Sequence, residues 1–141
     1  MADMKPLYTA SALATGDGRN GHVSTQDGLV DFDVRMPPEL GGPGGAPNPE
    51  LLFAAGYAAC FHSALRSVAR GTNADVTDSE VVADVSIGSL DNGGFGLAVA
   101  LEVNLPNVEP TLAQELLEKA HQVCPYSNAT RGNIEVTLSL A

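Results

Sequence analysis

The amino-acid sequence predicts an α+β domain in which antiparallel sheets pack on two main helices. Three observations support this fold class: an apolar stretch of helical character after residues 36–49, a hairpin around residues 91–94, and an amphipathic helix that stops at a proline. The predicted order of strands, helix, hairpin, helix and strand is typical of α+β architecture. Because 141 residues is the size of one domain, we expect a single domain over residues 1–141.

Three short strands are predicted near the start of the chain. They cover residues 7–14, 22–26 and 29–35, and Asp27-Gly28 provides a two-residue turn between the second and third strands. This pattern predicts an antiparallel meander. The residues that follow, 36–49, are so rich in Pro and Gly that we expect a long loop, and its length makes it a candidate lid or substrate-side segment.

A buried helix is predicted next. Asn48 offers a side-chain cap, Pro49 suits the first helical position, and Glu50 places a carboxylate in the positively polarised first turn. Gly71 is a favourable C-terminal stop. The first three turns are apolar all round, which indicates burial on several sides. The longest unbroken apolar run, residues 51–61, is about half of what a bilayer-spanning helix requires, so we expect no transmembrane segment.

The clearest hairpin in the sequence joins residues 80–88 and 95–105 through the turn at residues 91–94. Both segments alternate with the strand period, so each has one face that we expect to be buried. These faces carry Val81, Ala83, Val85 and Ile87 on the first strand, and Leu97, Val99, Leu101, Val103 and Leu105 on the second.

A second helix is predicted after this hairpin. Thr111 and Gln114 resemble a capping box, and apolar residues then recur at helical spacing. The helix should end at Cys124, because Pro125 disfavours helical dihedral angles in the residue before it. A polar segment then leads into a last strand at residues 134–141.

Composition and motifs exclude several function classes. The chain has 17 acidic and 7 basic residues, and a formal charge of −10 argues against nucleic acid or an anionic membrane as partner. No secretory signal is visible, so we expect a cytoplasmic protein. Residues 16–21 match a GxGxxG pattern, but strand-like residues follow, which argues against dinucleotide binding. His22, His62 and His121 lack a metal-binding pattern, and we expect His121 to be a solvated helix-face residue.

The two cysteines are the candidates for chemistry, because two are too few for a disulfide scaffold. An inert core position remains an alternative, since free cysteine is often buried. Burial of Cys60 in the apolar helix would raise its pKa, so a reactive Cys60 needs a positive charge from another segment. Arg19, in the turn of residues 16–21, is the strongest candidate. Cys124, at a helix end, is better placed to move, which suits a resolving thiol.

The segments around both cysteines resemble the organic hydroperoxide resistance (Ohr) branch of the OsmC/Ohr superfamily. They read PNPELLFAAGYAACFHSAL and VCPYSNATRGNIEVTL, and the resemblance extends to YTASALATGDGRNGHV, LGGPGGAPNPE and VTLSLA. It therefore runs the length of the chain. The resemblance implies an OsmC/Ohr-like intertwined homodimer with active sites at the subunit interface and with no metal or nucleotide cofactor.

The resemblance also implies a role for each candidate residue. Cys60 matches the peroxidatic cysteine, Cys124 the resolving cysteine, Arg19 the activating arginine, and Glu50 the carboxylate that orients this arginine. The implied activity is the reduction of alkyl and lipid hydroperoxides through a Cys60 sulfenic acid and a Cys60–Cys124 disulfide. The implied reductant is a lipoyl-type dithiol, namely dihydrolipoamide or a lipoylated protein.

The apolar run around Cys60 offers a binding surface for an alkyl tail, and we expect Leu52, Phe53 and Phe61 to form it. Glu50 cannot reach Cys60 within one helix, because ten residues correspond to about 15 Å of rise and a rotation of roughly 80°. Either Arg19 spans this gap, or an antiparallel copy of the helix in a partner subunit brings its own Glu50. We favour the second arrangement, since a dimer would cover the far side of an apolar helix.

Two other functions stay open at this point. The chain could be a non-enzymatic binder of a small hydrophobic ligand with structural cysteines, because fold similarity does not fix function. A thiol-based redox sensor is the third possibility, although no recognisable DNA-binding or effector segment accompanies the cysteine pair. Titration of the Cys60 thiol separates them, since a binder should show an ordinary or raised pKa.

Overall fold

The structure is a computed structural model that describes residues 3–141, and the chain forms two compact units divided after Pro49. The first unit contains β1 (Ala12–Thr15), η1 (Gly18–Asn20), β2 (His22–Thr25), β3 (Asp31–Asp33) and η2 (Pro38–Leu40). The second unit contains α1 (Pro49–Ala69) except its first residue, followed by β4 (Glu80–Ser89), β5 (Phe95–Asn104), α2 (Pro110–Val123), α3 (Pro125–Thr130) and β6 (Val136–Leu140). That these two units belong to a single domain over residues 1–141 stays a prediction.

The first unit is built on the predicted antiparallel meander, in the order β1-β2-β3. The register of β2 and β3 pairs His22 with Asp33, which centres the connection on Asp27-Gly28 as predicted. Gly28 has a φ of +76°, which a glycine adopts without strain. The strand β1 is shorter than the predicted 7–14, because its pairing partner β2 covers only four residues.

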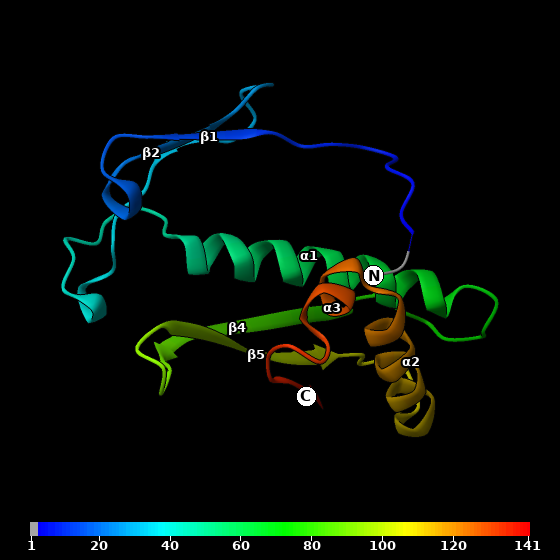
Figure 1. Ribbon diagram of the computed structural model, residues 1–141. Coiled ribbons are helices and arrows are strands. Elements are labelled where there is room, and N and C mark those ends of the chain that lie inside the picture. The colour runs from blue at the N-terminus through cyan, green and yellow to red at the C-terminus, as the bar shows by residue number, and fades with distance from the viewer. Residues whose placement is uncertain (1–2) are drawn as a thin grey trace. The chain divides into compact units, whose positions relative to one another are not determined.

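The helix α1 begins at Pro49, as predicted, and ends at Ala69 just before Gly71, whose φ is +81°. By length and composition alone α1 could cross a membrane. Within the second unit one side of α1 packs into the core, while Leu51 and Leu52 remain 57% and 39% exposed. Figure 1 shows that α1 runs along the β4–β5 hairpin.

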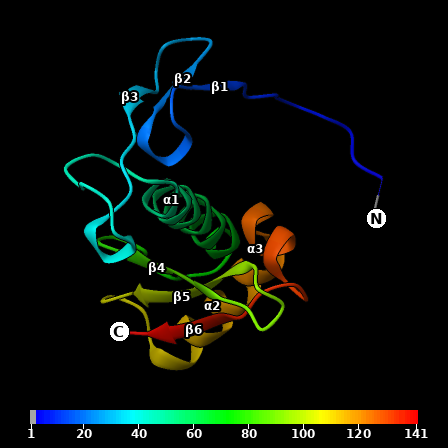
Figure 2. The same ribbon diagram turned by 60° about the vertical axis from the view of Figure 1, so that its left-hand side comes forward.

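The second sheet has the strand order β4-β5-β6. The predicted β4–β5 hairpin is confirmed, with antiparallel pairs from Glu80 and Asn104 to Ser89 and Phe95. The last strand differs from the expectation of antiparallel sheets, because β6 pairs with β5 in parallel. The physical reason is the helical connection: α2 and α3 carry the chain back along the sheet, so β6 enters in the same direction as β5 (Figure 2).

The start of α2 corrects the predicted capping box. The N-cap is Glu109, whose carboxylate accepts hydrogen bonds from the backbone N–H groups of Thr111 and Leu112 at 2.9 and 3.1 Å. Pro110 therefore takes the first helical position, where its missing N–H costs nothing. The helix ends at Val123, and Cys124 caps it, as predicted.

The short helix α3 was not predicted, because residues 125–133 read as a polar connection. Pro125 ends α2 and also occupies the first position of α3, so Cys124 is both the C-cap of one helix and the N-cap of the next. The core of the second unit lies between α1, β5 and α2. Its completely buried members include Tyr57, Phe61, Leu65, Val103, Leu116, Leu117, Ala120 and Cys124.

Candidate active site

The structure brings the two cysteines together although 64 positions separate them in the sequence. The Cys124 thiol donates a hydrogen bond to the Cys60 sulfur, and the two Sγ atoms are 3.7 Å apart. Cys60 is half-buried on α1, whereas Cys124 is completely buried between α2 and α3. A disulfide has an S–S distance of about 2.05 Å, so the sulfurs need to approach by about 1.7 Å.

The surroundings of Cys60 raise its pKa above the ordinary value of a thiol. Burial is the largest cause, because it disfavours the charged thiolate, and the neighbouring Cys124 also raises the pKa. The backbone N–H of Tyr126 acts in the opposite direction, since it donates a hydrogen bond to the Cys60 sulfur and stabilises the thiolate. This balance agrees with the sequence argument that a reactive Cys60 needs a positive charge from another segment.

Arg19 lies in η1 of the first unit, and its pairing with Cys60 stays a prediction. Hydrogen bonds within the first unit hold the turn that carries Arg19. Nη1 of Arg35 donates to the carbonyl oxygens of Asn20 and Gly21 at 3.0 and 2.9 Å. The Asn20 side chain accepts from the backbone N–H of Met36 at 3.0 Å. These contacts fix the backbone of the turn directly after Arg19.

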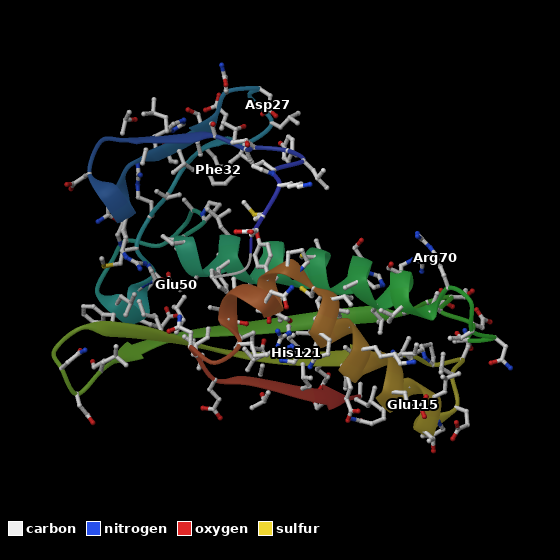
Figure 3. All side chains as sticks on the ribbon, turned by 45° about the vertical axis from the view of Figure 1, so that its right-hand side comes forward. Asp27, Phe32, Glu50, Arg70, Glu115 and His121 are labelled. Atoms are coloured by element: carbon white, nitrogen blue, oxygen red, sulfur yellow. The ribbon has the colours of Figure 1, made fainter. Side chains whose placement is uncertain are left out.

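Glu50 lies in the first turn of α1, and Figure 3 shows it at one end of this helix, with Arg70 beyond the other end. Because α1 is uninterrupted from Pro49 to Ala69, Glu50 and Cys60 are separated by about 15 Å along its axis. The structure therefore does not bring these two residues together within one helix. Delivery of Glu50 by a partner subunit stays a prediction.

The predicted alkyl-binding residues lie in different environments. Phe53 lies seven positions before Cys60, on the same side of α1, whereas Leu52 is exposed and points about 80° away. Phe61 is completely buried in the core, which favours a packing role over contact with a substrate. Phe53 also lines a hollow of about 590 Å³ within the second unit. Other apolar side chains around this hollow are Leu90, Phe95, Leu97, Ala129 and Ile134.

An aromatic cluster beside Cys60 adds Tyr57 and Tyr126, which were not predicted, to the predicted Phe53. The ring of Tyr126 lies 6.1 Å from that of Phe53 and 5.5 Å from that of Tyr57. Tyr57 lies three positions before Cys60 on α1, so helical spacing alone places it on the same side. That spacing is a signal the sequence contained. The contact with Tyr126 depends on the unpredicted helix α3.

A buried polar network adjoins this cluster. The Tyr57 hydroxyl is hydrogen-bonded to Ser127 Oγ at 2.8 Å and to Thr130 Oγ1 at 3.1 Å, and Ser127 Oγ is also 2.8 Å from His121 Nδ1. His121, which α2 contributes (Figure 3), is therefore not the solvated residue that we expected. Burial and the positive charge of Arg131 lower the pKa of His121.

The remaining histidines have structural partners. His22 is hydrogen-bonded to Asp33 and Asp31 at 2.8 and 2.6 Å, which raises its pKa. His62 is hydrogen-bonded to Ser79 at 2.9 Å. Among residues 3–141, no three His, Cys, Asp or Glu side chains gather in a group that could hold a metal ion.

The fold and the site together define an α+β protein in which two free cysteines lie with their Sγ atoms 3.7 Å apart. The family model of OsmC-like proteins matches residues 42–139. The organic hydroperoxide resistance protein of Xanthomonas axonopodis pv. citri (strain 306) is 50% identical over 139 residues, which cover 97% of this chain and 96% of that protein. The chain belongs to the OsmC-like family, in its organic hydroperoxide resistance branch, as the sequence predicted.

Solved structures agree with this membership. A crystal structure of an organic hydroperoxide resistance protein from Legionella pneumophila has a TM-score of 0.92 and 52% identity, and it covers 97% of this chain and 99% of its own. The corresponding structure from Elizabethkingia anophelis has a TM-score of 0.92 and 56% identity, with 98% and 99% coverage. The α+β fold of the OsmC/Ohr type is thereby confirmed.

Proposed function

We propose that this chain is a thiol peroxidase that reduces organic hydroperoxides, with Cys60 as the attacking thiolate and Cys124 as the resolving thiol. The observation that carries the proposal is the 3.7 Å contact between a half-buried and a completely buried sulfur. An attacking thiol has to meet a substrate, whereas a resolving thiol has to reach only the first sulfur. Relatives named organic hydroperoxide resistance protein support the substrate class.

The proposed reaction has three balanced steps. The Cys60 thiolate attacks the terminal peroxide oxygen, so an S–O bond forms, the O–O bond breaks, and the alkoxide leaves and takes up a proton to become an alcohol. The Cys124 thiol then condenses with the Cys60 sulfenic acid, which forms the disulfide and releases water before irreversible oxidation occurs. An external dithiol finally reduces the disulfide through a mixed disulfide and is itself oxidised to a cyclic disulfide.

Arg19 and Glu50 complete the proposed site. A guanidinium beside Cys60 would favour the thiolate and would stabilise the charge that develops on the leaving alkoxide. Glu50 would hold this guanidinium in place. Burial raises the pKa of Cys60, so this thiol requires a nearby cation to ionise near neutral pH, and Arg19 is the cation that we propose.

The apolar surroundings support a preference for bulky substrates. Phe53 lies on the Cys60 side of α1 and also lines the 590 Å³ hollow, so an alkyl chain next to Cys60 would find apolar surface. Each buried methylene group contributes about 0.8 kcal/mol. We predict that cumene hydroperoxide has a kcat/KM at least about a hundredfold above that of hydrogen peroxide. Equal values, in a steady-state assay of both substrates, would contradict a role in organic hydroperoxide reduction.

The partners and location belong to the same proposal. We propose dihydrolipoamide or a lipoylated protein as reductant, a homodimer as the assembly, and the cytoplasm as the compartment. A dithiol suits the last step, because its second thiol resolves the mixed disulfide within one molecule. Turnover with dihydrolipoamide, compared with glutathione at equal thiol concentration, tests the choice of reductant.

The two cysteine roles are tested by treating Cys60→Ser and Cys124→Ser proteins with one equivalent of an alkyl hydroperoxide. Cys60→Ser should consume no peroxide. Cys124→Ser should consume about one equivalent and leave a sulfenic acid that dimedone traps, as intact-mass spectrometry would show. Substantial peroxide consumption by Cys60→Ser would reverse the assignment, and none by the unmodified protein would favour the ligand-binder alternative.

A further inference from the structure

The proposed chemistry does not use the most buried polar cluster of the second unit. Ser127 is completely buried, Thr130 is 4% exposed, and both lie on α3 immediately after the segment that contacts Cys60. Buried hydroxyl groups are costly unless they are hydrogen-bonded, and apolar residues of the same size would pack without this requirement. The cluster therefore calls for an explanation beyond packing.

We propose that Ser127 is a positioning residue for Cys60, because its bonds to Tyr57 on α1 and His121 on α2 hold the first turn of α3 against the Cys60 sulfur. The proposal rests on the proposed function, which gives this placement its catalytic purpose. Ser127 acts through the residues of its own helical turn. The Sγ of Cys124 lies 3.7 Å from the Cys60 Sγ, and the backbone N–H of Tyr126 favours the Cys60 thiolate.

The backbone of α3 explains how Ser127 transmits its position. The N–H of Asn128 donates to the carbonyl of Cys124 at 2.9 Å, so one helical turn encloses Pro125, Tyr126 and Ser127. Tyr126 lies inside this turn and cannot shift independently of Ser127. Anchoring the Ser127 side chain therefore also fixes the Tyr126 N–H and the Cα of Cys124 relative to α1.

A single set of proton positions satisfies all four contacts of the network. Thr130 Oγ1 donates to the carbonyl of Ser127 at 3.3 Å, so Tyr57 must donate to Thr130. Ser127 Oγ must then donate to Tyr57, and the Nδ1–H of His121 must donate to Ser127. The chain of donors thus begins at a neutral His121 with its proton on Nδ1. Burial and Arg131 favour this neutral form, because both lower the pKa of His121.

The fit of the Tyr126 side chain supports the same placement. A Cβ atom on Gly56 would lie 2.7 Å from the Tyr126 hydroxyl, so the missing side chain on α1 leaves room for this ring. The ring also contacts the rings of Phe53 and Tyr57. The first turn of α3 is therefore fixed to α1 by ring packing and by the Ser127 hydroxyl together.

The test compares the pH dependence of Cys60 alkylation by iodoacetamide in full-length proteins that carry Cys124→Ser, so that a single thiol reacts. In this background, Ser127→Ala and Tyr57→Phe should each move the inflection of the rate profile to higher pH. Each should also reduce the alkylation rate at pH 7 by about two- to tenfold, as expected for a weakened hydrogen bond to a thiolate. The alkylation rate of the double variant should fall by less than the product of the two single reductions, because both changes act on one network.

Thr130→Val provides the matched control. It removes a hydroxyl from the same buried cluster but leaves the bonds of Ser127 to Tyr57 and His121 in place. Its loss of stability in urea should resemble that of Ser127→Ala, while its alkylation profile should stay at the parent position. Tyr57→Phe keeps the aromatic ring, so it reports on the hydroxyl even if Ser127→Ala folds poorly.

Two outcomes would overturn the proposal: unchanged alkylation profiles in Ser127→Ala and Tyr57→Phe, or an equal shift in Thr130→Val. Alkylation requires no peroxide, so this result does not depend on peroxidase activity. If the unmodified protein fails to reduce peroxide while the alkylation profiles of the variants shift as expected, the role of Ser127 in positioning Cys60 is supported and the proposed function is contradicted.

Discussion

At the scale of single residues, the central question is what ionises Cys60. Burial and Cys124 raise its pKa, and the Tyr126 N–H opposes them. We predict that Arg19→Ala moves the Cys60 pKa still higher and slows the attack on an organic hydroperoxide by about a hundredfold or more, because the cation also stabilises the leaving alkoxide. Stopped-flow peroxide consumption and the ultraviolet absorbance of the thiolate measure the two effects.

Arg70→Ala is the matched control for Arg19→Ala. Arg70 is exposed, lies just past the end of α1, and carries the same charge (Figure 3). Arg70→Ala should leave the Cys60 pKa and the rate of peroxide consumption unchanged. If it changed them as much as Arg19→Ala does, the effect of Arg19 would come from the net charge of the protein and not from its position. Glu50→Ala should slow peroxide consumption less than Arg19→Ala does. The double variant should be slowed by less than the two single effects combined, since Glu50 acts through Arg19.

Gly56 gives a second prediction at this scale. Replacing a glycine inside a helix by alanine normally stabilises a protein by about 1 kcal/mol. In α1 the added Cβ would meet the Tyr126 hydroxyl at 2.7 Å and displace its ring from Phe53 and Tyr57. Gly56→Ala should therefore leave the free energy of unfolding of the unmodified protein unchanged but raise it by about 1 kcal/mol in a Tyr126→Ala background. Urea unfolding measures both values, and an equal increase in the two backgrounds would contradict the close contact between Gly56 and the Tyr126 ring.

At the scale of secondary-structure elements, the cap of α2 makes stability depend on pH. Two backbone N–H groups donate to the Glu109 carboxylate and lower its pKa below the ordinary 4.5. The ionised form is thus favoured in the folded state. The cap should stabilise the protein fully above pH 4.5, and this contribution should disappear as the pH falls through the lowered value.

Glu109→Ala tests this dependence. The variant should unfold at a lower urea concentration than the unmodified protein at pH 7, and the two midpoints should converge in acid. Glu115→Ala removes the same charge from the exposed face of α2 without removing the cap. A midpoint for Glu115→Ala as low as that of Glu109→Ala at pH 7 would attribute the effect to net charge instead of capping.

At the scale of the whole molecule, both units carry large apolar side chains in contact with solvent. Leu7, Tyr8 and Leu13 are 99%, 80% and 62% exposed, and α1 exposes Leu51. Apolar surface of this kind is typical of interaction sites, and we propose a second copy of the chain as its occupant. The same copy would bring a Glu50 that α1 itself cannot deliver to Cys60.

Mixing two inactive variants tests whether sites are shared between subunits. One variant carries Cys60→Ser, and the other carries Arg19→Ala with Glu50→Ala. In a shared site, each heterodimer regains one working site, so an equal mixture should recover about a quarter of the unmodified activity. Native mass spectrometry confirms subunit exchange. No recovery despite exchange would exclude a site in which one chain supplies Cys60 and the other supplies both Arg19 and Glu50, and it would leave the peroxidase proposal standing.

The sequence by itself determined the elements whose signals are local. Asp27-Gly28 and residues 91–94 defined two hairpins, because turn chemistry and the strand period act within a few residues. Pro49 marked the first residue of α1, and Pro125 marked the end of α2. The long motifs around both cysteines identified the family and with it the candidate residues.

Only the tertiary structure decided which side chains meet. The cysteine sulfurs are 64 positions apart, and Tyr57 and Ser127 are 70 positions apart, so helical and strand periods cannot pair them. The direction of β6 likewise depended on where α2 and α3 return the chain. The helical or strand period of the apolar residues shows which face of an element is buried. The packing of whole elements decides which residues meet on that face, and the environment of Cys60 results from this packing.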